Sequence, residues 1–379
     1  MTEIADRLYL RAAVELAEQG LFSCTPNPRV GCLIVKDGQV LGRGAHLRAG
    51  EGHAEVNALA DAHGDVSGAT VYVSLEPCAH TGRTPPCAQA LISANVRRVV
   101  AAMRDPNPQV AGQGLAQLRA AGIRAELRPL PESEALNAGY VLRQTEGRPF
   151  VRIKVAQSLD GRTAMASGES RWITGPEARA DVQYWRARSC ALITGSGTVL
   201  ADDPELGVRD RRYAVQGRLR QPLRVVADTS LRVPADAALI KADGPLLFAH
   251  GAGTPVPATA PRAGVEYFAC GDGAIDLPRL LEALAARGCN EVLVEAGPRL
   301  VGAFLARDLW DELIVYVAPK LLGSDARPMA ELPLLAMAQA VHATMRDCAV
   351  LGDDLRLRLV PRPGAEPQNA QDAESQSRS

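Results

Sequence analysis

The sequence predicts an α/β protein of two domains. Strand-like apolar runs alternate with segments of helical periodicity in both halves of the chain, a pattern typical of α/β layering. The length of 379 residues fits two domains of ordinary size. The alternation stops at 145–149, and a new strand begins at Phe150. We therefore expect one domain at 1–146, a second at 147–361 and a tail at 362–379.

The first half is expected to contain a sheet layered with helices. Apolar side chains at helical spacing over 4–19, followed by Gly20, predict an amphipathic helix that ends at a glycine. Asp37-Gly38 between two apolar runs predicts a tight turn and a hairpin, because this dipeptide accepts positive φ. The remaining elements expected here are helices at 54–62, 87–94 and 114–121 and strands at 70–75 and 98–103.

The second half predicts a further sheet of at least five strands with helices between them. The proline-rich stretch 251–262 is expected to be a surface loop. The tail lacks aromatic residues and is rich in Gln, Ser and Glu, which predicts disorder. Strands are expected at 150–155, 191–194, 223–227, 245–248, 292–295 and 313–317, and helices near 176–187 and 278–287.

Composition and charge exclude several classes of protein. Lys and Arg number 42 against 43 Asp and Glu, so the net charge of −1 provides no field that would hold a nucleic acid. No apolar run approaches the length of a membrane span, and the first residues do not resemble a secretion signal, so we expect a cytoplasmic protein without membrane contact. Eight cysteines are too few for a disulfide scaffold, which favours roles as metal ligands or nucleophiles.

One group of residues has the composition of a catalytic zinc site. His53 and Glu55 precede an expected helix, Cys78 follows a strand, and Cys87 begins the next helix. An imidazole and two thiolates leave the fourth tetrahedral position open for water. Two thiolates cancel the charge of the metal, so a nearby carboxylate is needed to take the proton of that water. Glu55 is the candidate for this role. Residues two apart on a helix face different directions, so if His53 binds zinc, Glu55 should point past the metal toward the water and the substrate.

A closed structural zinc site is the alternative. It would require a fourth ligand, and His80, two residues after Cys78, is the candidate. The two cysteines are separated by eight residues, so the motif also departs from the Cys-x-x-Cys spacing of the zinc deaminases of nucleobases. The residues alone leave both readings open.

Three motifs together closely resemble the bifunctional deaminase/reductase family of riboflavin biosynthesis. They are Thr25 to Gly31, His53 to Leu59, and Glu76 to Cys87 with its long loop between the cysteines. The resemblance implies a cytidine-deaminase-like domain followed by a dihydrofolate-reductase-like domain. It also implies that His53, Cys78 and Cys87 hold one zinc ion, that Glu55 transfers protons and that Asn27 orients the pyrimidine. Arg83, in the loop between the cysteines, is a candidate contact of the substrate phosphate, although an arginine in a polar loop is more often simply solvated. From its residue type alone, Asn27 is equally a turn residue between two prolines.

The second half has no Gly-x-Gly-x-x-Gly fingerprint after a strand, which disfavours a Rossmann domain. Instead, the segments that start at Lys154, Ser170, Gly197 and Val294 resemble, in order, the reductase motifs of the same family. The resemblance implies an NADPH site formed by Ala156, Trp172, Thr198, Asp202, Thr229 and the segment from Gly297. It implies a site for the sugar phosphate formed by Ser170, Arg186, Leu206, Arg209 and Glu295.

The resemblance implies two successive reactions on a small phosphorylated pyrimidine. A diaminopyrimidinone with a ribosylamino 5-phosphate loses ammonia, and the ribosyl group of the resulting aminouracil is then reduced by NADPH to ribityl. Lys154 and Asp202 are the candidate proton donors for the reduction. Members of the family commonly assemble, so a homo-oligomer is also expected. Two alternatives stay open: a zinc deaminase of nucleobases or nucleosides with a C-terminal binding module, and a protein in which zinc is only structural.

Overall fold

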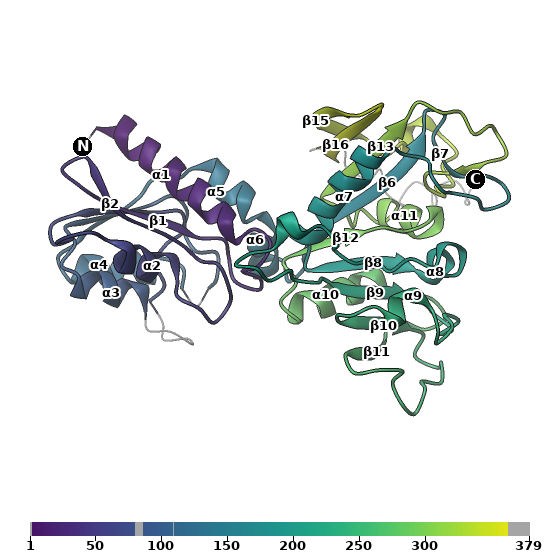
Figure 1. Ribbon diagram of the computed structural model, residues 1–379, viewed down its shortest axis with the longest axis horizontal. Coiled ribbons are helices and arrows are strands. Elements are labelled where there is room, and N and C mark those ends of the chain that lie inside the picture. Colours follow the sequence, from purple (N-terminus) through teal and green to yellow (C-terminus); the bar gives the residue numbers. More distant parts are fainter. Residues whose placement is uncertain (1, 80–85, 109, 363–379) are drawn as a thin grey trace, which may run out of the picture. The chain divides into compact units, whose positions relative to one another are not determined.

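The structure is a computed structural model that describes residues 2–79, 86–108 and 110–362 (Figure 1). Nearly all of the expected tail therefore lies outside the described residues. No helix in the described part of the chain is long and apolar enough to cross a membrane. The chain divides into two compact units, the first made of residues 1–150, 210–220 and 281–291 and the second of residues 151–209, 221–280 and 292–379.

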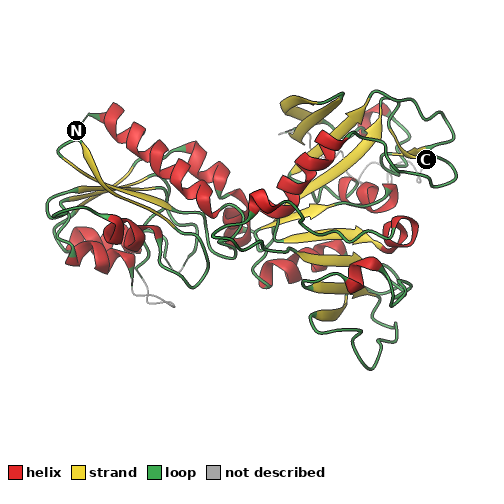
Figure 2. Cartoon of the chain, viewed as in Figure 1, coloured by secondary structure: helices red, strands yellow, loops and turns green. Residues whose placement is uncertain are grey.

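The first unit contains a five-stranded sheet in the order β2-β1-β3-β4-β5. Strand β1 is antiparallel to β2 and β3, whereas β3, β4 and β5 are parallel. Helices cover both faces of this sheet (Figures 1 and 2), so the expected α/β/α layering is confirmed. The elements are α1 Glu3–Ala17, β1 Gly31–Lys36, β2 Gln39–Ala45, α2 Ala54–Asp61, β3 Thr70–Val73, α3 Cys87–Ser93, β4 Arg98–Ala101, α4 Gln113–Ala120, β5 Arg124–Leu127, α5 Pro131–Leu136 and α6 Ala138–Thr145, with a short 3-10 helix at Glu18–Gly20.

The alternation of side chains along β1 explains the two layers. Cys32 and Ile34 point to a core that contains α2, α3 and α4, whereas Leu33 and Val35 point to a core that contains α1. Both sets of side chains are almost completely buried. A central strand buried on both faces must be apolar throughout, which is why β1, β3 and β4 read as continuous apolar runs.

The second unit contains a nine-stranded sheet in the order β11-β10-β9-β8-β12-β6-β13-β16-β15. Helix α7 packs on this sheet through Ala178, Val182 and Trp185. A separate core joins α8 and α9 to β9, β10 and β11. The elements are β6 Phe150–Ser158, β7 Arg162–Ala164, α7 Pro176–Arg188, β8 Ala191–Gly195, α8 Ser196–Asp202, β9 Leu223–Ala227, α9 Ala238–Lys241, β10 Leu246–His250, β11 Val265–Ala269, α10 Leu277–Ala286, β12 Glu291–Val294, α11 Pro298–Leu305, β13 Glu312–Ala318, β14 Arg327–Pro328, β15 Ala343–Leu351 and β16 Asp354–Pro361, with 3-10 helices at Arg211–Tyr213 and Met337–Gln339.

The direction of the strands places the functional edge of this sheet. Strand β8 is parallel to both of its neighbours, β9 and β12. The carboxyl ends of these three strands, at Gly195, Ala227 and Val294, therefore meet at one edge. Ligands of open α/β sheets bind at this edge, because the loops that follow the strands converge there.

Candidate active sites

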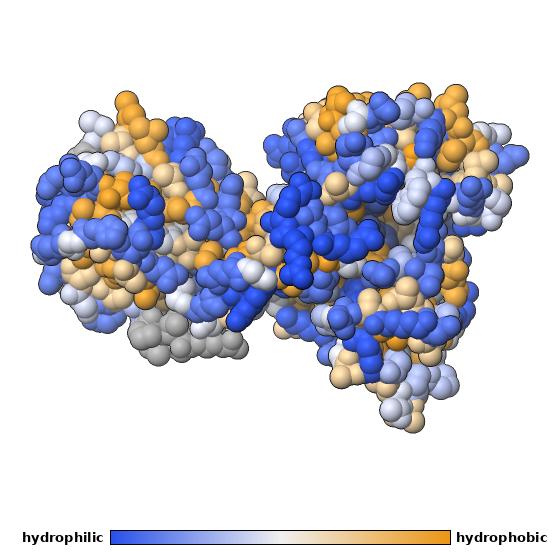
Figure 3. Space-filling view, viewed as in Figure 1, coloured by the Kyte–Doolittle hydropathy of each residue, from blue (hydrophilic) through white to orange (hydrophobic). Residues whose placement is uncertain are grey.

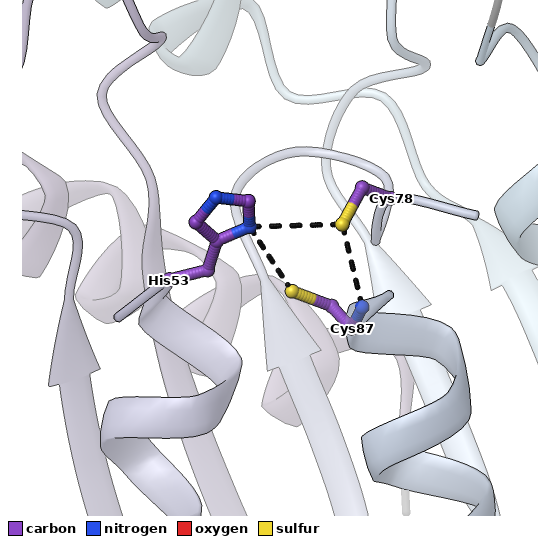
Figure 4. Close-up of side chains that lie close together, drawn as sticks. All are labelled: His53, Cys78 and Cys87. Atoms are coloured by element: carbon purple, nitrogen blue, oxygen red, sulfur yellow. Dashed lines mark hydrogen bonds between the residues drawn. The ribbon is translucent and has the colours of Figure 1, made fainter. Parts of the chain in front are cut away.

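The three expected zinc ligands are brought together in the first unit. His53 is the residue before α2, Cys87 is the first residue of α3, and Cys78 lies in the loop after β3. Their ligand atoms lie within 4.8 Å of one another and point toward a common centre (Figure 4). Nδ1 of His53 is 3.2 Å from Sγ of Cys87 and 3.6 Å from Sγ of Cys78.

These distances fit a tetrahedral zinc ion. Zinc-sulfur and zinc-nitrogen bonds of about 2.3 and 2.0–2.1 Å place the ligand atoms of a tetrahedral site roughly 3.5 Å apart. Hydrogen bonding from Cys87 and from His53, opposed by burial, lowers the pKa of the Cys78 thiol to about 4. The three groups therefore match the charge and spacing that zinc requires, and they form the one such cluster among the described residues.

Glu55 lies in the first turn of α2, next to this cluster, and only 3% of it is exposed. Burial, together with the negative charge of Cys78, raises the pKa of Glu55 to about 7. A carboxyl group with a pKa near neutrality can both take and return a proton, which is what general acid-base catalysis requires. The position is what its spacing from His53 predicts, beside the ligands rather than among them.

Helix α2 can approach β2 closely because β2 carries glycines. A Cβ atom at Gly44 would overlap the carbonyl oxygen of Ala54, and one at Gly42 would overlap that of Ala58. Both positions therefore need a residue without a side chain. The close approach brings the end of β2, and His46 immediately after it, beside His53, whose ring centroid is 5.1 Å from that of His46.

His46 is a residue of the site that the sequence motifs did not single out. Its Nδ1 is 3.0 Å from the carbonyl oxygen of Gly52, which can only accept, so Nδ1 carries the proton. Nε2 is then free to accept from the Asn27 amide, 3.0 Å away. This bond holds the Asn27 amide on His46, whose ring in turn lies against that of the expected zinc ligand His53. The signal in the sequence was a lone histidine after a strand of small residues.

Glu76 fixes the loop that carries Cys78. Its carboxylate is buried and accepts backbone N–H bonds from Gly112, Leu115 and Asp105 at 2.9, 3.1 and 3.3 Å. These bonds tie the start of α4 to the residue two positions before the ligand. His80, the candidate fourth ligand, and Arg83, the candidate phosphate contact, lie outside the described residues.

A cavity of about 1120 Å³ opens in the second unit at the carboxyl ends of β8, β9 and β12. Its walls contain every residue that the resemblance assigned to the reductase. These residues are Ala156, Ser170, Trp172, Arg186, Thr198, Asp202, Leu206, Arg209, Thr229, Glu295 and Gly297.

One wall of this cavity carries a buried charge cluster. Arg186 binds Glu295 through Nε and Nη2 at 2.6 and 2.9 Å, and Nζ of Lys154 lies 3.8 Å from the same carboxylate. Burial raises the pKa of Glu295, but the Arg186 guanidinium more than offsets this and holds it below the usual value. Burial lowers the pKa of Lys154. The cluster has two cations and one anion, so a net positive charge faces the cavity.

The cavity lining also contains an exposed tryptophan. Trp172 is 63% exposed, although tryptophan is more often a core residue, and the guanidinium of Arg179 lies 4.5 Å from its ring centroid. Ser170 donates a hydrogen bond to Asp202 at 2.8 Å, and Thr198 accepts one from the backbone N–H of Gly297 at 3.1 Å. The last bond joins the starts of α8 and α11 across the cavity.

Both units are similar to known proteins. Residues 4–103 match the family described as the cytidine and deoxycytidylate deaminase zinc-binding region, and residues 149–357 match the RibD C-terminal domain. The riboflavin biosynthesis protein RibD of Escherichia coli is 48% identical to this chain, with 94% of this chain and 99% of the relative covered.

Solved structures agree with this likeness. A RibD structure from Acinetobacter baumannii is 46% identical with a TM-score of 0.89, and it covers 94% of this chain and 99% of its own. A Thermotoga maritima protein is 29% identical with a TM-score of 0.83 and the same coverage. It is described as a diaminohydroxyphosphoribosylaminopyrimidine deaminase/5-amino-6-(5-phosphoribosylamino)uracil reductase.

The alternative of a deaminase with a C-terminal binding module is wrong, because the second half matches a reductase domain. The chain belongs to the RibD family of bifunctional riboflavin biosynthesis enzymes, in which a zinc-binding deaminase domain precedes an NADPH-dependent reductase domain.

Proposed function

We propose that residues 1–146 deaminate a diaminopyrimidinone that carries a ribosylamino 5-phosphate, and that residues 147–361 reduce the product, with residues 362–379 outside both domains. The grouping of His53, Cys78 and Cys87 around one centre is the observation that carries the first assignment. The convergence of the reductase residues on one cavity supports the second. The substrate itself is the one named in the description of the Thermotoga maritima relative.

In the deamination, His53, Cys78 and Cys87 would hold zinc and Glu55 would move the protons. Zinc, when bound, supplies an acidified water as the nucleophile. The buried Glu55 accepts a proton from this water and returns one to the exocyclic amine. Asn27, held by His46, orients the ring through its amide. Water adds to the ring carbon, the bond to the exocyclic nitrogen breaks, and ammonia leaves.

In the reduction, the cavity would align the nicotinamide with C1 of the ribosylamino group. NADPH supplies the hydride when bound. Ala156, Trp172, Thr198, Asp202, Thr229 and Gly297 would bind the cofactor, and Ser170, Arg186, Leu206, Arg209 and Glu295 the sugar phosphate. The hydride forms a C–H bond at C1, the bond from C1 to the ring oxygen opens, and a proton completes the new hydroxyl group.

We assign that proton to Lys154 rather than to Asp202. Burial lowers the pKa of Lys154, which makes its ammonium group a stronger acid than a surface lysine. Glu295, 3.8 Å away, holds the side chain at the cavity wall. Asp202 instead accepts a hydrogen bond from Ser170.

A coupled assay tests both halves. The purified chain is given the phosphorylated diaminopyrimidinone and NADPH, and ammonia release is followed together with the loss of NADPH absorbance. Zinc removal by a chelator should abolish ammonia release and leave reduction of the deaminated substrate unchanged. Ammonia release that persists without zinc, or NADPH loss when the zinc-free chain is given the diamino compound, would overturn the division of labour.

The same proposal includes assembly into a homo-oligomer and a cytoplasmic location. Leu335, Met337 and Val350 are 93%, 88% and 72% exposed, in or near the edge strand β15, and apolar atoms gather over β15 and β16 in Figure 3. Exposed apolar patches of this kind mark contact surfaces. Val350→Lys should then reduce the molar mass measured by light scattering. None of the eight cysteines, all of which are described, is joined in a disulfide, as a reducing compartment would require.

A further inference from the structure

The end of the reductase cavity next to β9 carries an arginine to which the reductase motifs assign no role. Arg232 lies in the turn after β9 and lines the cavity together with Ala227 and Thr229. Its side chain is 62% exposed. The turn is tight: Leu231 has a φ of 50°, and its N–H donates to the carbonyl oxygen of Asp228 at 3.1 Å.

Two contacts aim the Arg232 guanidinium across the cavity mouth. Nη2 donates to Oγ of Ser196, the first residue of α8, at 3.1 Å, and Nε lies 4.0 Å from Oδ1 of Asp228. Among the described residues these are its polar contacts, so most of its five N–H donors stay available to a ligand. Asp228 is itself buried, with Oδ2 accepting from the N–H of Val233 at 2.9 Å. Its other oxygen, Oδ1, has no hydrogen-bond partner in the described part of the chain.

The two ends of the cavity are far enough apart to hold the two halves of a dinucleotide. Lys154 and Glu295 lie at β6 and just after β12, whereas Arg232 follows β9. Strands β6 and β9 are three places apart in the sheet, which at about 4.8 Å per strand is roughly 14 Å. A nicotinamide beside Lys154 therefore leaves the adenosine half of the cofactor at the β9 end.

We propose that Arg232 binds the 2′-phosphate of NADPH and thereby selects this cofactor over NADH. The inference rests on the proposed cofactor cavity. A guanidinium offers paired donors to a phosphate, and an arginine close to the adenosine ribose is the usual means of accepting a 2′-phosphate. The carboxylate of Asp228 is completely buried, so it faces the Arg232 guanidinium rather than a ligand in the cavity.

Two other arginines that line the cavity are less well placed. Arg299 is 89% exposed and lies 3.8 Å from Glu331, its partner. Arg307 lies just after α11 and donates to the carbonyl of Ala303 on its own helix. Arg307 also lines the cavity. Like Arg232, it is exposed and carries a positive charge, so it serves as a matched control.

The experiment measures binding of two small probes to the full chain by calorimetry. Adenosine 2′,5′-bisphosphate carries the 2′-phosphate, whereas AMP lacks it. Arg232→Gln should weaken binding of the bisphosphate about 10- to 100-fold and change AMP binding by less than about threefold. Arg232→Lys should recover part of the loss, because it keeps the charge without the forked donors. Arg307→Gln should bind both probes as the unmodified chain does, and the ratio of KM for NADPH to KM for NADH should rise only in the Arg232 variants.

Each other outcome counts against the inference. Unchanged bisphosphate binding in Arg232→Gln, an equal loss of AMP binding, a Lys variant no better than the Gln variant, or a larger effect of Arg307→Gln would each overturn it. Failure of the unmodified chain to bind the bisphosphate at all would instead refute the proposed cofactor cavity. Because Arg232 is exposed, its replacement should not unfold the protein, and an unchanged melting temperature confirms this.

Discussion

The zinc site and the reductase cavity are built in opposite ways. In the first unit, three ligands and one carboxylate lie on or next to two helix starts and one loop, and each has a chemistry that few residue types supply. In the second unit, the cavity of about 1120 Å³ is lined by alanine, threonine, serine, leucine and arginine from many separate segments. The first site depends on the identity of a few atoms, whereas the second depends on the shape and charge of a wall. Single substitutions should therefore abolish the first activity and only reduce the second.

The largest effect is expected for the thiolate ligands. Cys78→Ser or Cys87→Ser should remove both zinc and deamination, because a hydroxyl group is a poor replacement for a thiolate at zinc. Zinc content by mass spectrometry and ammonia release measure the two losses. Reduction of the deaminated substrate should continue, since its residues lie in the other unit. Retention of zinc and of ammonia release in either variant would show that the ligand set is wrong.

Glu55→Gln should separate chemistry from metal binding. The amide has the same shape but cannot carry the proton, so deamination should fall about 100- to 10,000-fold. His53, Cys78 and Cys87 are unchanged, so the zinc content should stay near that of the unmodified chain. A loss of both zinc and deamination would contradict this prediction, because it would show that Glu55 is a structural residue of the site.

Much of the fold could be predicted from the sequence because its periodicity is strong. The expected hairpin, the buried central strands and the helices at 54–62, 87–94 and 114–121 are all present. The β15-β16 hairpin was missed, although residues 355–359 alternate apolar and charged side chains in the sequence Leu-Arg-Leu-Arg-Leu. The arginines of β16 are neutralised by carboxylates of α7, β13 and β15, for example Arg356 by Asp181 and Asp347. That pairing exists only after the sheet has formed.

The sequence also reveals more of the zinc site than of the reductase cavity. His53, Cys78 and Cys87 are residue types that bind zinc, and each lies beside an expected strand or helix end, so their chemistry alone indicated a zinc site. Trp172 and Arg186 are common types with common structural roles, and only the family resemblance singled them out. Their convergence depends on which strands are neighbours, and no local pattern records that strand β12 lies between β8 and β6.

Breaking the charge cluster tests whether the cavity wall needs it. Arg186→Met leaves the Glu295 carboxylate buried with only Lys154, 3.8 Å away, and removing one partner of a buried ion pair costs about 3 kcal/mol. The three tryptophans of the chain all lie in the second unit, so the midpoint of urea unfolding by tryptophan fluorescence reports on that unit. Arg299→Gln, which breaks an exposed ion pair, is the control and should change stability by less than about 0.5 kcal/mol. Similar shifts in both variants would mean that burial does not strengthen the cluster.

A smaller effect is expected from pH. Arg186 holds the pKa of Glu295 below its usual value even though burial raises it. A carboxyl group with a lowered pKa in the folded state stabilises the fold above its unfolded pKa of about 4.3, and this stabilisation is lost as the pH falls through the folded value. Between pH 5 and pH 3, the second unit should therefore lose more stability in the unmodified chain than in Glu295→Gln, as followed by the same fluorescence. If stability falls with pH equally in the two proteins, the pKa of Glu295 is not lowered in the folded state.

The smallest effect is expected at Trp172, which we propose contacts the cofactor rather than the core. The side chain is 63% exposed, so Trp172→Ala should change the unfolding midpoint by less than about 0.5 kcal/mol. If the ring stacks on the cofactor, the loss of one aromatic contact should raise KM for NADPH roughly three- to tenfold. Trp172→Phe should recover most of this, since a phenyl ring can still stack beneath Arg179. An unchanged KM in the alanine variant, or a loss of stability without a change in KM, would show that Trp172 lines the cavity without contacting the cofactor.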